Sequence, residues 1–515
     1  MSEGTVHPLA QPVGRTHAAG AFDWRAVPSA DPRASAFALD TAPALPAAAE
    51  EFSGEACREI VEDLLDRTRT GAAVAEVHAP FCESKCDGCG CWQHAYKELE
   101  SRRWADALVR EMAAWADTHA QAGAPIQALR FGGGTPSALE PVDILHVLAK
   151  ARQYLPLSND CSIELQARVH GFSEEKIEAA LAGGVTRFVL PVRSFSTEVR
   201  QAAGRLDAGG AAEKLLKRLT EYNESAVAVE LNFGLPGQSL EVWTADLERA
   251  CQLPLDGLMI RAAGEPDMLG EVAKTFRAAD PALMARMHER AFEVLADNGW
   301  ERRTALAWSR SERDRTTFDV LAAGDADKFA FGCGAHGRLF GRELLIEPEL
   351  GEWLSAVWMG RRPVSSVAEP KSGWRAAALL AQGALLGRFS LERIEHASGL
   401  RITESLEPLF DNWTAAGLLR RSLMTGLLPG SFAVQVLLVL GFVLPMQDFT
   451  GIRRLRLVWR SELMPQNCLS CRTDCWAAAA SKPLLKSFLP MCGRAQNGLR
   501  RSLDSLFLQS RTRIV

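Results

Sequence analysis

The sequence predicts an α/β fold, a partial β/α barrel, followed by a C-terminal domain that is helical or of the winged-helix type. Three observations lead to this prediction. Between about residues 72 and 340, short apolar runs alternate with amphipathic helical patterns. Cysteine, glycine and arginine motifs come directly after several of those runs. Residues 373–421 instead show the pattern of short helices, without strands of any length.

Seven apolar runs are the predicted strands of the barrel. They lie at residues 72–78, 126–131, 161–165, 186–192, 226–233, 256–262 and 328–334. Amphipathic patterns at 102–120 and 173–184 are examples of the helices between them. Strands that alternate with helices form a parallel sheet covered by helices. In a β/α barrel the chemistry takes place at the carboxyl ends of the strands, and most of the unusual motifs follow a predicted strand.

Changes of composition divide the chain into four parts. They are an N-terminal extension rich in alanine and proline (1–55), the barrel (56–345), the C-terminal helical domain (346–445) and a basic tail that contains cysteines (446–515). The longest apolar run, FAVQVLLVLGFVLP near 432–445, contains Gln435 and is too short to span a bilayer. We therefore expect a buried helix there and no membrane span.

The composition excludes several classes of partner and location. The 515 residues carry a net charge of −5, which gives no sign of a nucleic-acid or anionic-membrane partner. The first twenty residues lack the apolar core of a signal peptide, so a cytoplasmic protein is expected. In that reducing compartment, clustered cysteines indicate metal ligands or catalytic groups.

The stretch CESKCDGCGC places four cysteines, Cys82, Cys86, Cys89 and Cys91, within ten residues directly after the first predicted strand. Structural zinc usually takes two separated cysteine pairs, and the spacing here is different. Three thiolates spaced C-x3-C-x2-C can occupy three corners of a four-iron cluster, which leaves the fourth iron open to a small molecule. A zinc knuckle and inert core thiols are the alternatives. Cys89 and Cys91 are only two residues apart, which makes Cys91 an awkward ligand of the same ion.

At these motifs the sequence resembles the radical S-adenosylmethionine enzymes. VHAPFCESKCDGCGC, FGGGTPSAL, VRSFSTEVRQAAGRLD and FGLPGQS occur in the order typical of the oxygen-independent coproporphyrinogen III oxidase (HemN) family. The segment LAWSRSERDRTTFDVLAAGDADKFAFGCGAHG is similar to the haem-utilisation branch of that family, HutW and ChuW. The resemblance covers residues 72–345 closely and 373–445 loosely, and implies a radical S-adenosylmethionine barrel with a HemN-type C-terminal domain.

The resemblance implies two cofactors, a 4Fe–4S cluster and S-adenosylmethionine. The implied cluster ligands are Cys82, Cys86 and Cys89. The implied cofactor-binding residues are Gly133, Gly134, Thr135, Glu164, Arg193, Arg205 and Glu230. In this interpretation the glycine turn admits backbone groups to the polar end of S-adenosylmethionine, Glu164 accepts a hydrogen bond from its ammonium and Glu230 binds its ribose. Taken singly, these side chains have ordinary alternatives, such as a tight turn, a surface carboxylate or a solvated helix charge.

The sequence departs from the family pattern at five positions. Glu76 and Gly88 stand where the family usually has aromatic residues. Arg193 replaces a glutamine, Glu230 replaces an aspartate and His336 replaces a glycine of the haem branch. An arginine at 193 is compatible with binding the methionine carboxylate. The five changes bear on whether the pocket carries out the family reaction unaltered.

Two histidines and a second cysteine set complete the candidates. His78 and His336 are the leading candidates to approach a porphyrin iron or propionate, and the alternative for each is a hydrogen-bonded structural residue. The tail cysteines could hold an auxiliary cluster or zinc, or belong to an unstructured end; they are Cys468, Cys471, Cys475 and Cys492. Cys91 corresponds to a cysteine of the coproporphyrinogen oxidases that is not a ligand.

Three functions follow from these observations. The first is anaerobic haem degradation, which in this branch is expected to use two molecules of S-adenosylmethionine, to transfer a methyl-derived carbon, to open the ring and to free the iron. The second is oxidative decarboxylation of coproporphyrinogen III. The third is a haem-binding or haem-trafficking protein with little catalysis. An electron donor of the flavodoxin or ferredoxin type is implied for the two enzymes.

Overall fold

The computed structural model describes residues 50–86, 93–263, 279–370, 373–415, 418–423 and 432–436. Its centre is a sheet in which seven neighbouring strands run parallel, in the order β12-β2-β5-β6-β7-β8-β9. In chain order these strands are β2 (Ala73–Ala79), β5 (Ile126–Gly133), β6 (Leu157–Gln166), β7 (Arg187–Arg193), β8 (Ala226–Phe233), β9 (Gly257–Ala262) and β12 (Asp327–Phe331). All seven predicted strands are therefore present, and the predicted fold class is confirmed.

Antiparallel strands extend the sheet at both edges, to 13 strands in the described part of the chain. One edge continues through β13 (His336–Leu339), β14 (Arg342–Ile346), β15 (Val364–Glu369) and β1 (Glu50–Ser53). The other continues through β11 (Ala307–Ser309) and β10 (Glu301–Arg302). No pairing among the described strands joins the two edges, so the barrel is partial.

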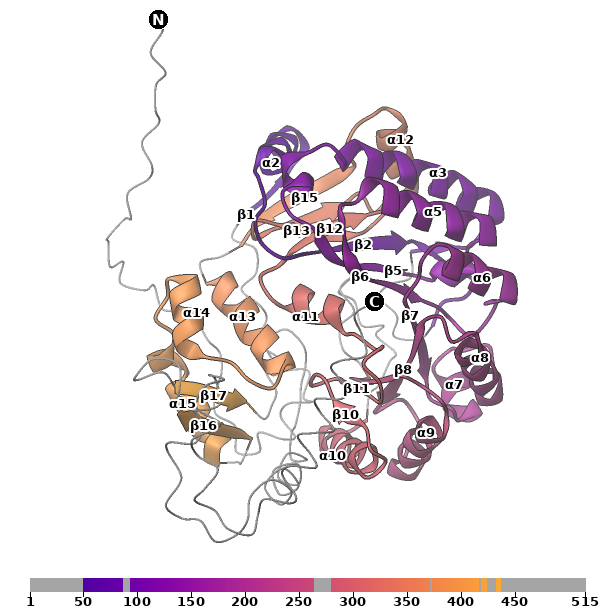
Figure 1. Cartoon of the computed structure of the whole chain (residues 1–515), viewed down its shortest axis with the longest axis vertical. Coiled ribbons are helices and arrows are strands. Elements are labelled where there is room, and N and C mark those ends of the chain that lie inside the picture. The colour runs from indigo at the N-terminus through magenta and orange to yellow at the C-terminus, as the bar shows by residue number, and fades with distance from the viewer. Residues whose placement is uncertain are drawn as a thin grey trace, which may run out of the picture. The chain divides into compact units, whose positions relative to one another are not determined.

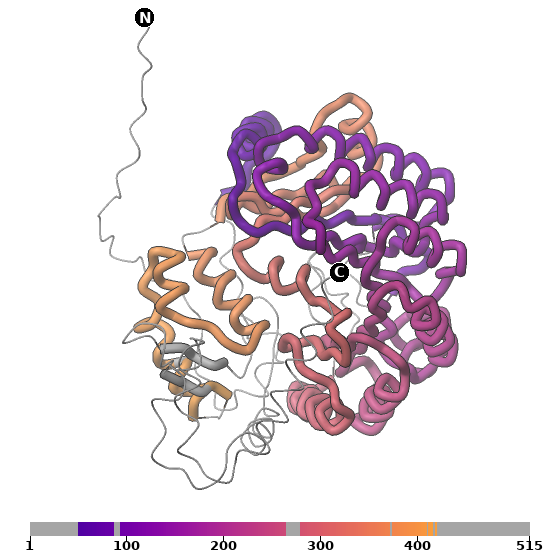
Figure 2. Tube along the Cα trace, viewed as in Figure 1, coloured from indigo at the N-terminus to yellow at the C-terminus, as the bar shows by residue number. Residues whose placement is uncertain are grey.

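Helices cover the outer face of the parallel strands, as Figure 1 shows. In chain order they are α3 (Glu98–Trp115), α5 (Pro141–Tyr154), α6 (Glu174–Ala182), α7 (Thr197–Ala202), α8 (Gly209–Tyr222), α9 (Leu240–Gln252) and α10 (Pro281–Asp297). Local signals start several of them: Pro281 occupies the first turn of α10, and Ser239 accepts a hydrogen bond from Val242 N at the start of α9. The trace in Figure 2 follows this strand–helix alternation around the curve from β2 to β9.

Strand β8 shows how the sequence divides its side chains between the two faces. Val227 and Val229 pack in the main core under the helices, whereas Ala228 joins Val189 and Met259 in a small cluster on the inner face. The short helix α11 (Thr317–Ala323) lies against that face, where Phe318 packs with residues of β2 and β5.

The remaining helices and strands are short elements of the N-terminal part and the helices and strands of the C-terminal part. They are α2 (Gly54–Asp66), α4 (His119–Ala122), α12 (Leu350–Trp358), α13 (Trp374–Leu385), α14 (Leu391–Ser398), α15 (Thr403–Ala415), β16 (Leu419–Leu423) and β17 (Phe432–Val436), with β3 (Phe81–Cys82) pairing β4 (His94–Ala95). Strands β16 and β17 form an antiparallel pair. Three helices followed by such a pair agree with the predicted helical or winged-helix domain.

One expectation is wrong. The predicted buried helix at 432–445 begins as a strand, because 432–436 pair with β16 along five residues. Phe432, Val434 and Val436 alternate with Ala433 and Gln435, a period of two that suits a strand, and short apolar runs do not distinguish the two structures. Residues 437–445 lie outside the described part. Within that part, no helix is long and apolar enough to cross a membrane.

Candidate functional site

A network of buried charges forms the inner wall of the barrel. Glu164 at the end of β6 accepts hydrogen bonds from Arg130 Nε at 2.6 Å and from Arg187 Nη1 at 2.5 Å. Arg187 Nε also donates to Asp314 Oδ1 at 2.6 Å, and Arg130 Nη2 to Asp319 Oδ1 at 2.7 Å. Burial opposes the charged form of Arg187, but Glu164 and Asp314 outweigh it and raise its pKa. Glu164, predicted to meet the cofactor ammonium, thus has both oxygens engaged by guanidinium groups.

The first two cysteines of the motif lie at the end of β3 and just beyond it, and both are buried. Cys82 Sγ lies 3.2 Å from Thr135 Oγ1, in the turn after β5. Cys86 Sγ accepts a hydrogen bond from Arg168 Nη2 at 3.1 Å, and Arg168 Nη1 also holds the carbonyl oxygen of Ser84 at 2.9 Å. Arg168 therefore fixes the loop between the two thiols and places a positive charge on the second.

The glycine turn after β5 allows the strand that carries the cysteines to approach closely. Gly133 has φ +94°, and a Cβ atom there would lie 2.7 Å from the His78 ring. A Cβ at Gly134 would lie 2.7 Å from Phe81 O and 3.1 Å from Cys82 Sγ. Gly134 N itself donates to Ala79 O at 2.7 Å. The glycines were expected to let the cofactor approach the backbone. The structure adds that, because they lack a Cβ atom, β2 and the Cys82 thiol can also lie close to this turn.

A group of like charges faces the second thiol. Arg205 is buried, and neither a hydrogen bond nor a carboxylate engages its guanidinium among the described residues; its Nε is fully enclosed. Burial, and then the neighbouring Arg193, lower the pKa of Arg205 to about 10, while Cys86 acts in the opposite direction. Arg193 ends β7 with φ +75°, a backbone conformation that side chains seldom adopt outside functional sites, and donates to Asn232 Oδ1 at 3.3 Å. Such a site favours an anion.

Glu230, on β8, is buried and accepts a hydrogen bond from Arg261 Nε at 2.8 Å. On the neighbouring strand β7, Glu230 pairs with Pro191, which lies two residues before Arg193. The carboxylate therefore stands near the carboxyl end of the sheet, as its predicted ribose-binding role requires, but with one oxygen already paired.

His78 lies at the carboxyl end of β2, and His336 begins β13, which follows β12. His78 contacts the glycine turn, and the Nε2 atoms of both His78 and His336 are buried without a hydrogen-bond partner in the described structure. Burial lowers the pKa of His78 to about 4, partly offset by Glu76, and burial also lowers the pKa of His336. Both rings are therefore neutral at pH 7. Glu76, which replaces a family aromatic residue, pairs with Lys328 Nζ at 3.1 Å.

Other predicted residues fall outside the described part of the chain. They are Gly88, Cys89, Cys91, Cys468, Cys471, Cys475 and Cys492. The ligand role of Cys89 and the roles given to the tail cysteines stay predictions. Among the described residues, no group of three or more histidine, cysteine or carboxylate side chains could hold a metal ion by itself.

Sequence reasoning missed Arg168, Arg130 and Arg187. Arg168 had a usable signal, since it stands two residues after the end of β6, at the edge where the other motifs lie. Arg130 and Arg187 had none, because each is a charged residue within an apolar strand whose carboxylate partners lie up to 189 residues away.

A partial β/α barrel with cysteine thiols beside a glycine turn at its carboxyl edge defines the radical S-adenosylmethionine class, and residues 77–250 match the radical SAM superfamily. The chain is 33% identical over 352 residues to the anaerobilin synthase of Escherichia coli O157:H7, covering 67% of this chain and 77% of that protein. The chain therefore belongs to the radical SAM superfamily, in the family of the anaerobilin synthase.

Two further similarities are more distant. The heme chaperone HemW of Escherichia coli K12 is 27% identical over 266 residues, which is 51% of this chain and 69% of HemW. The solved structure of the coproporphyrinogen III oxidase HemN from Escherichia coli superposes with a TM-score of 0.62, at 19% identity, over 75% of this chain and 91% of that one. The second similarity concerns the fold alone.

Radical SAM enzymes use a 4Fe–4S cluster and S-adenosylmethionine, and the described residues fit both groups. Two buried thiols, one of which accepts a hydrogen bond from Arg168, suit an anionic cluster. The buried guanidinium of Arg205, which no described residue pairs, lies beside Arg193 and suits a carboxylate, which would relieve the repulsion between the two arginines.

Replacing Arg205 tests the anion site. We expect Arg205→Met to weaken S-adenosylmethionine binding by about 1–3 kcal/mol, the range for losing a hydrogen bond to a charged group. The variant should keep or gain thermal stability without the cofactor, because it removes a buried charge that no described residue pairs. Equilibrium binding and thermal unfolding measure the two effects. Arg218→Met, on the exposed face of α8, is the control. Unchanged affinity would remove Arg205 from the site.

Proposed function

We propose that this protein degrades haem anaerobically as a radical S-adenosylmethionine enzyme, with transfer of a methyl-derived carbon, opening of the porphyrin ring and release of iron. The observation that supports catalysis is the buried guanidinium of Arg205, which no described residue pairs and which lies beside Arg193 and the Cys86 thiol. The similarity to the anaerobilin synthase, at 33% identity over 352 residues, supports a tetrapyrrole product.

The proposed roles come from the family resemblance, and the geometry of the described residues supports them. Cys82, Cys86 and Cys89 would hold the cluster, which when bound would supply the electron that cleaves S-adenosylmethionine to methionine and a 5′-deoxyadenosyl radical. Arg193 and Arg205 orient the methionine carboxylate. The remaining cofactor contacts come from the glycine turn with Thr135, from Glu164 and from Glu230.

The two histidines would face the porphyrin. A buried ring nitrogen without a partner carries a desolvation cost, which a ligand removes when it bonds there. Neutral imidazoles of lowered pKa can bind iron or accept a proton, and the ammonium of Lys328 is near enough to act on both rings. A haem propionate or the haem iron provides the matching chemistry.

Two other functions have specific support. The 27% identity to the heme chaperone HemW, together with the replacement of family aromatic residues by Glu76 and Gly88, favours a haem carrier. Cys91 favours coproporphyrinogen III decarboxylation. We place the protein in the cytoplasm, where an electron donor of the flavodoxin or ferredoxin type would reduce the cluster.

The rate of S-adenosylmethionine consumption separates these functions. In anaerobically reconstituted full-length protein with reductant, we expect haem to stimulate formation of 5′-deoxyadenosine or S-adenosylhomocysteine, with loss of the haem Soret band. Coproporphyrinogen III should stimulate less. Haem binding without any stimulation, in protein that carries its full cluster, would indicate the carrier. Stronger stimulation by coproporphyrinogen III would indicate the decarboxylase.

A further inference from the structure

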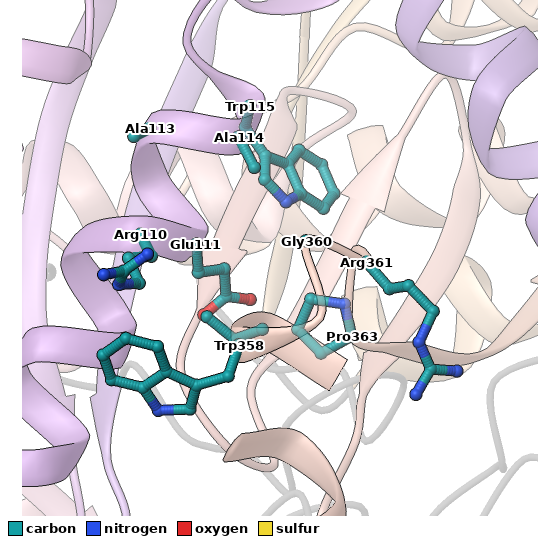
Figure 3. A pocket seen from close by; sticks show the side chains of 10 residues that line it. Arg110, Glu111, Ala113, Ala114, Trp115, Trp358, Gly360, Arg361 and Pro363 are labelled. Atoms are coloured by element: carbon teal, nitrogen blue, oxygen red, sulfur yellow. The ribbon is translucent and has the colours of Figure 1, made fainter. Parts of the chain in front are cut away.

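A cavity lies between helix α3 and the turn that follows α12. It has a volume of about 290 Å³ and is bounded by the C-terminal half of α3 and by the end of α12 with the turn that follows it. Figure 3 shows Glu111 and Trp115 inside it, with the guanidinium groups of Arg110 and Arg361 on opposite sides. The volume is close to the lower limit for small-molecule sites.

The floor of this cavity is an unusual carboxyl group. Glu111 is only 2% exposed. Its Oε2 accepts a hydrogen bond from Gly332 N at 2.8 Å, whereas its Oε1 has no hydrogen-bond partner among the described residues. The Trp353 indole is near enough to favour the ionised form but makes no well-formed hydrogen bond with it. A buried carboxyl oxygen in this state carries a desolvation cost, which a bound hydrogen-bond donor would recover.

The walls and the mouth complete the site. The Nε1 atom of Trp115 is also buried without a partner in the described structure, and Trp115, Val357 and Pro363 provide apolar surface. Arg361 at the mouth is exposed, and its only described side-chain contact is a weak one to Met359 Sδ at 3.6 Å. The cavity therefore offers an ionisable carboxyl group at its inner end, a positive guanidinium at its mouth and apolar walls between them.

We propose that this cavity binds a small zwitterion, an amino acid or an ω-amino acid. Its ammonium pairs with Glu111, its carboxylate with Arg361, and its carbon chain lies against Trp115. A simple cation would meet the positive charge at the mouth, and a simple anion would leave the buried acceptor of Glu111 unsatisfied. This site does not depend on the proposed function.

Binding should also release a proton. Burial raises the pKa of Glu111 to about 8, so it is mostly protonated at pH 7 and must ionise to pair with an ammonium. The Cys333 thiol, on the turn after β12, is near enough to interact with Glu111, and the guanidinium groups of Arg110 and Arg361 line the same cavity. Burial raises the pKa of Cys333, so that thiol stays neutral. Affinity should therefore increase as the pH rises toward 8.

Calorimetry on the full-length protein tests the site with four probes: L-alanine, 5-aminopentanoate, pentanoate and pentylamine. We expect at least one zwitterion to bind about tenfold or more tightly than pentanoate or pentylamine. The measured heat of binding should differ between buffers, because the released proton is taken up by the buffer. Glu111→Gln and Arg361→Ala should each weaken this binding at least about tenfold. The matched controls Glu100→Gln and Arg103→Ala, on the same helix α3, should not.

Arg361 is exposed, so its variant keeps the test valid even if Glu111→Gln unfolds the protein. No binding of either zwitterion, or equal binding of pentanoate, would overturn the proposal. Binding that Arg361→Ala and the controls affect equally would overturn it as well.

Discussion

Replacing Cys82, Cys86 and Cys89 together with alanine should abolish the brown absorbance of the main iron–sulfur site. Reconstituted wild-type protein is expected to bind about four irons there, as for a four-iron cluster. The physical reason is the arrangement of the first two thiols, which are buried beside the glycine turn, with Arg168 donating to the second. Iron analysis and the visible spectrum after anaerobic reconstitution measure the effect.

A matched control is available in the barrel. Cys161→Ala removes a half-buried thiol of β6 that has no place in the motif, and it should leave the iron content unchanged. If the triple variant keeps its full cluster, the assignment is wrong. The tail set that includes Cys468 and Cys471 then becomes the better candidate.

Arg187→Met should destabilise the protein by about 3–5 kcal/mol, the range for breaking a buried ion pair by removing one partner. Arg187 is 1% exposed and pairs with both Glu164 and Asp314. Burial already raises the pKa of Asp314, and the loss of Arg187 leaves this carboxyl group without its guanidinium partner. Urea unfolding of the full chain measures the change.

The control for this prediction is Arg249→Met, which breaks a half-exposed pair with Glu213 and should cost less than about 1 kcal/mol. Adding Asp314→Asn to Arg187→Met should recover part of the loss, because the buried charge is removed with its partner. A loss no larger than that of Arg249→Met would show that the network does not stabilise the inner wall.

The sequence was sufficient for the order of strands and helices. Apolar runs such as AVAVELNF, separated by helical patterns, located all seven parallel strands. A strand of a parallel sheet that is covered on both faces is largely apolar along its whole length. The same reasoning failed at Phe432–Val436, where a short apolar run has no periodicity long enough to separate helix from strand.

The site could be predicted only in part. Motif spacing singled out Cys82 and Cys86, and the resemblance singled out Arg193 and Arg205; their roles stay predictions. Spacing could not show that Arg193 adopts φ +75° or that Arg205 lies beside it, since tertiary packing sets both. Nor could it show that Glu164 would be shared between two guanidinium groups.

The mass of the tetrapyrrole product tests the central claim most directly. Full-length protein carrying its cluster is incubated anaerobically with haem, S-adenosylmethionine and reductant, and the pigment is analysed by mass spectrometry. We predict an iron-free, ring-opened tetrapyrrole that has gained a methyl-derived carbon, labelled when the methyl group of S-adenosylmethionine carries ¹³C. Haem recovered unchanged from protein with a full cluster would contradict this account.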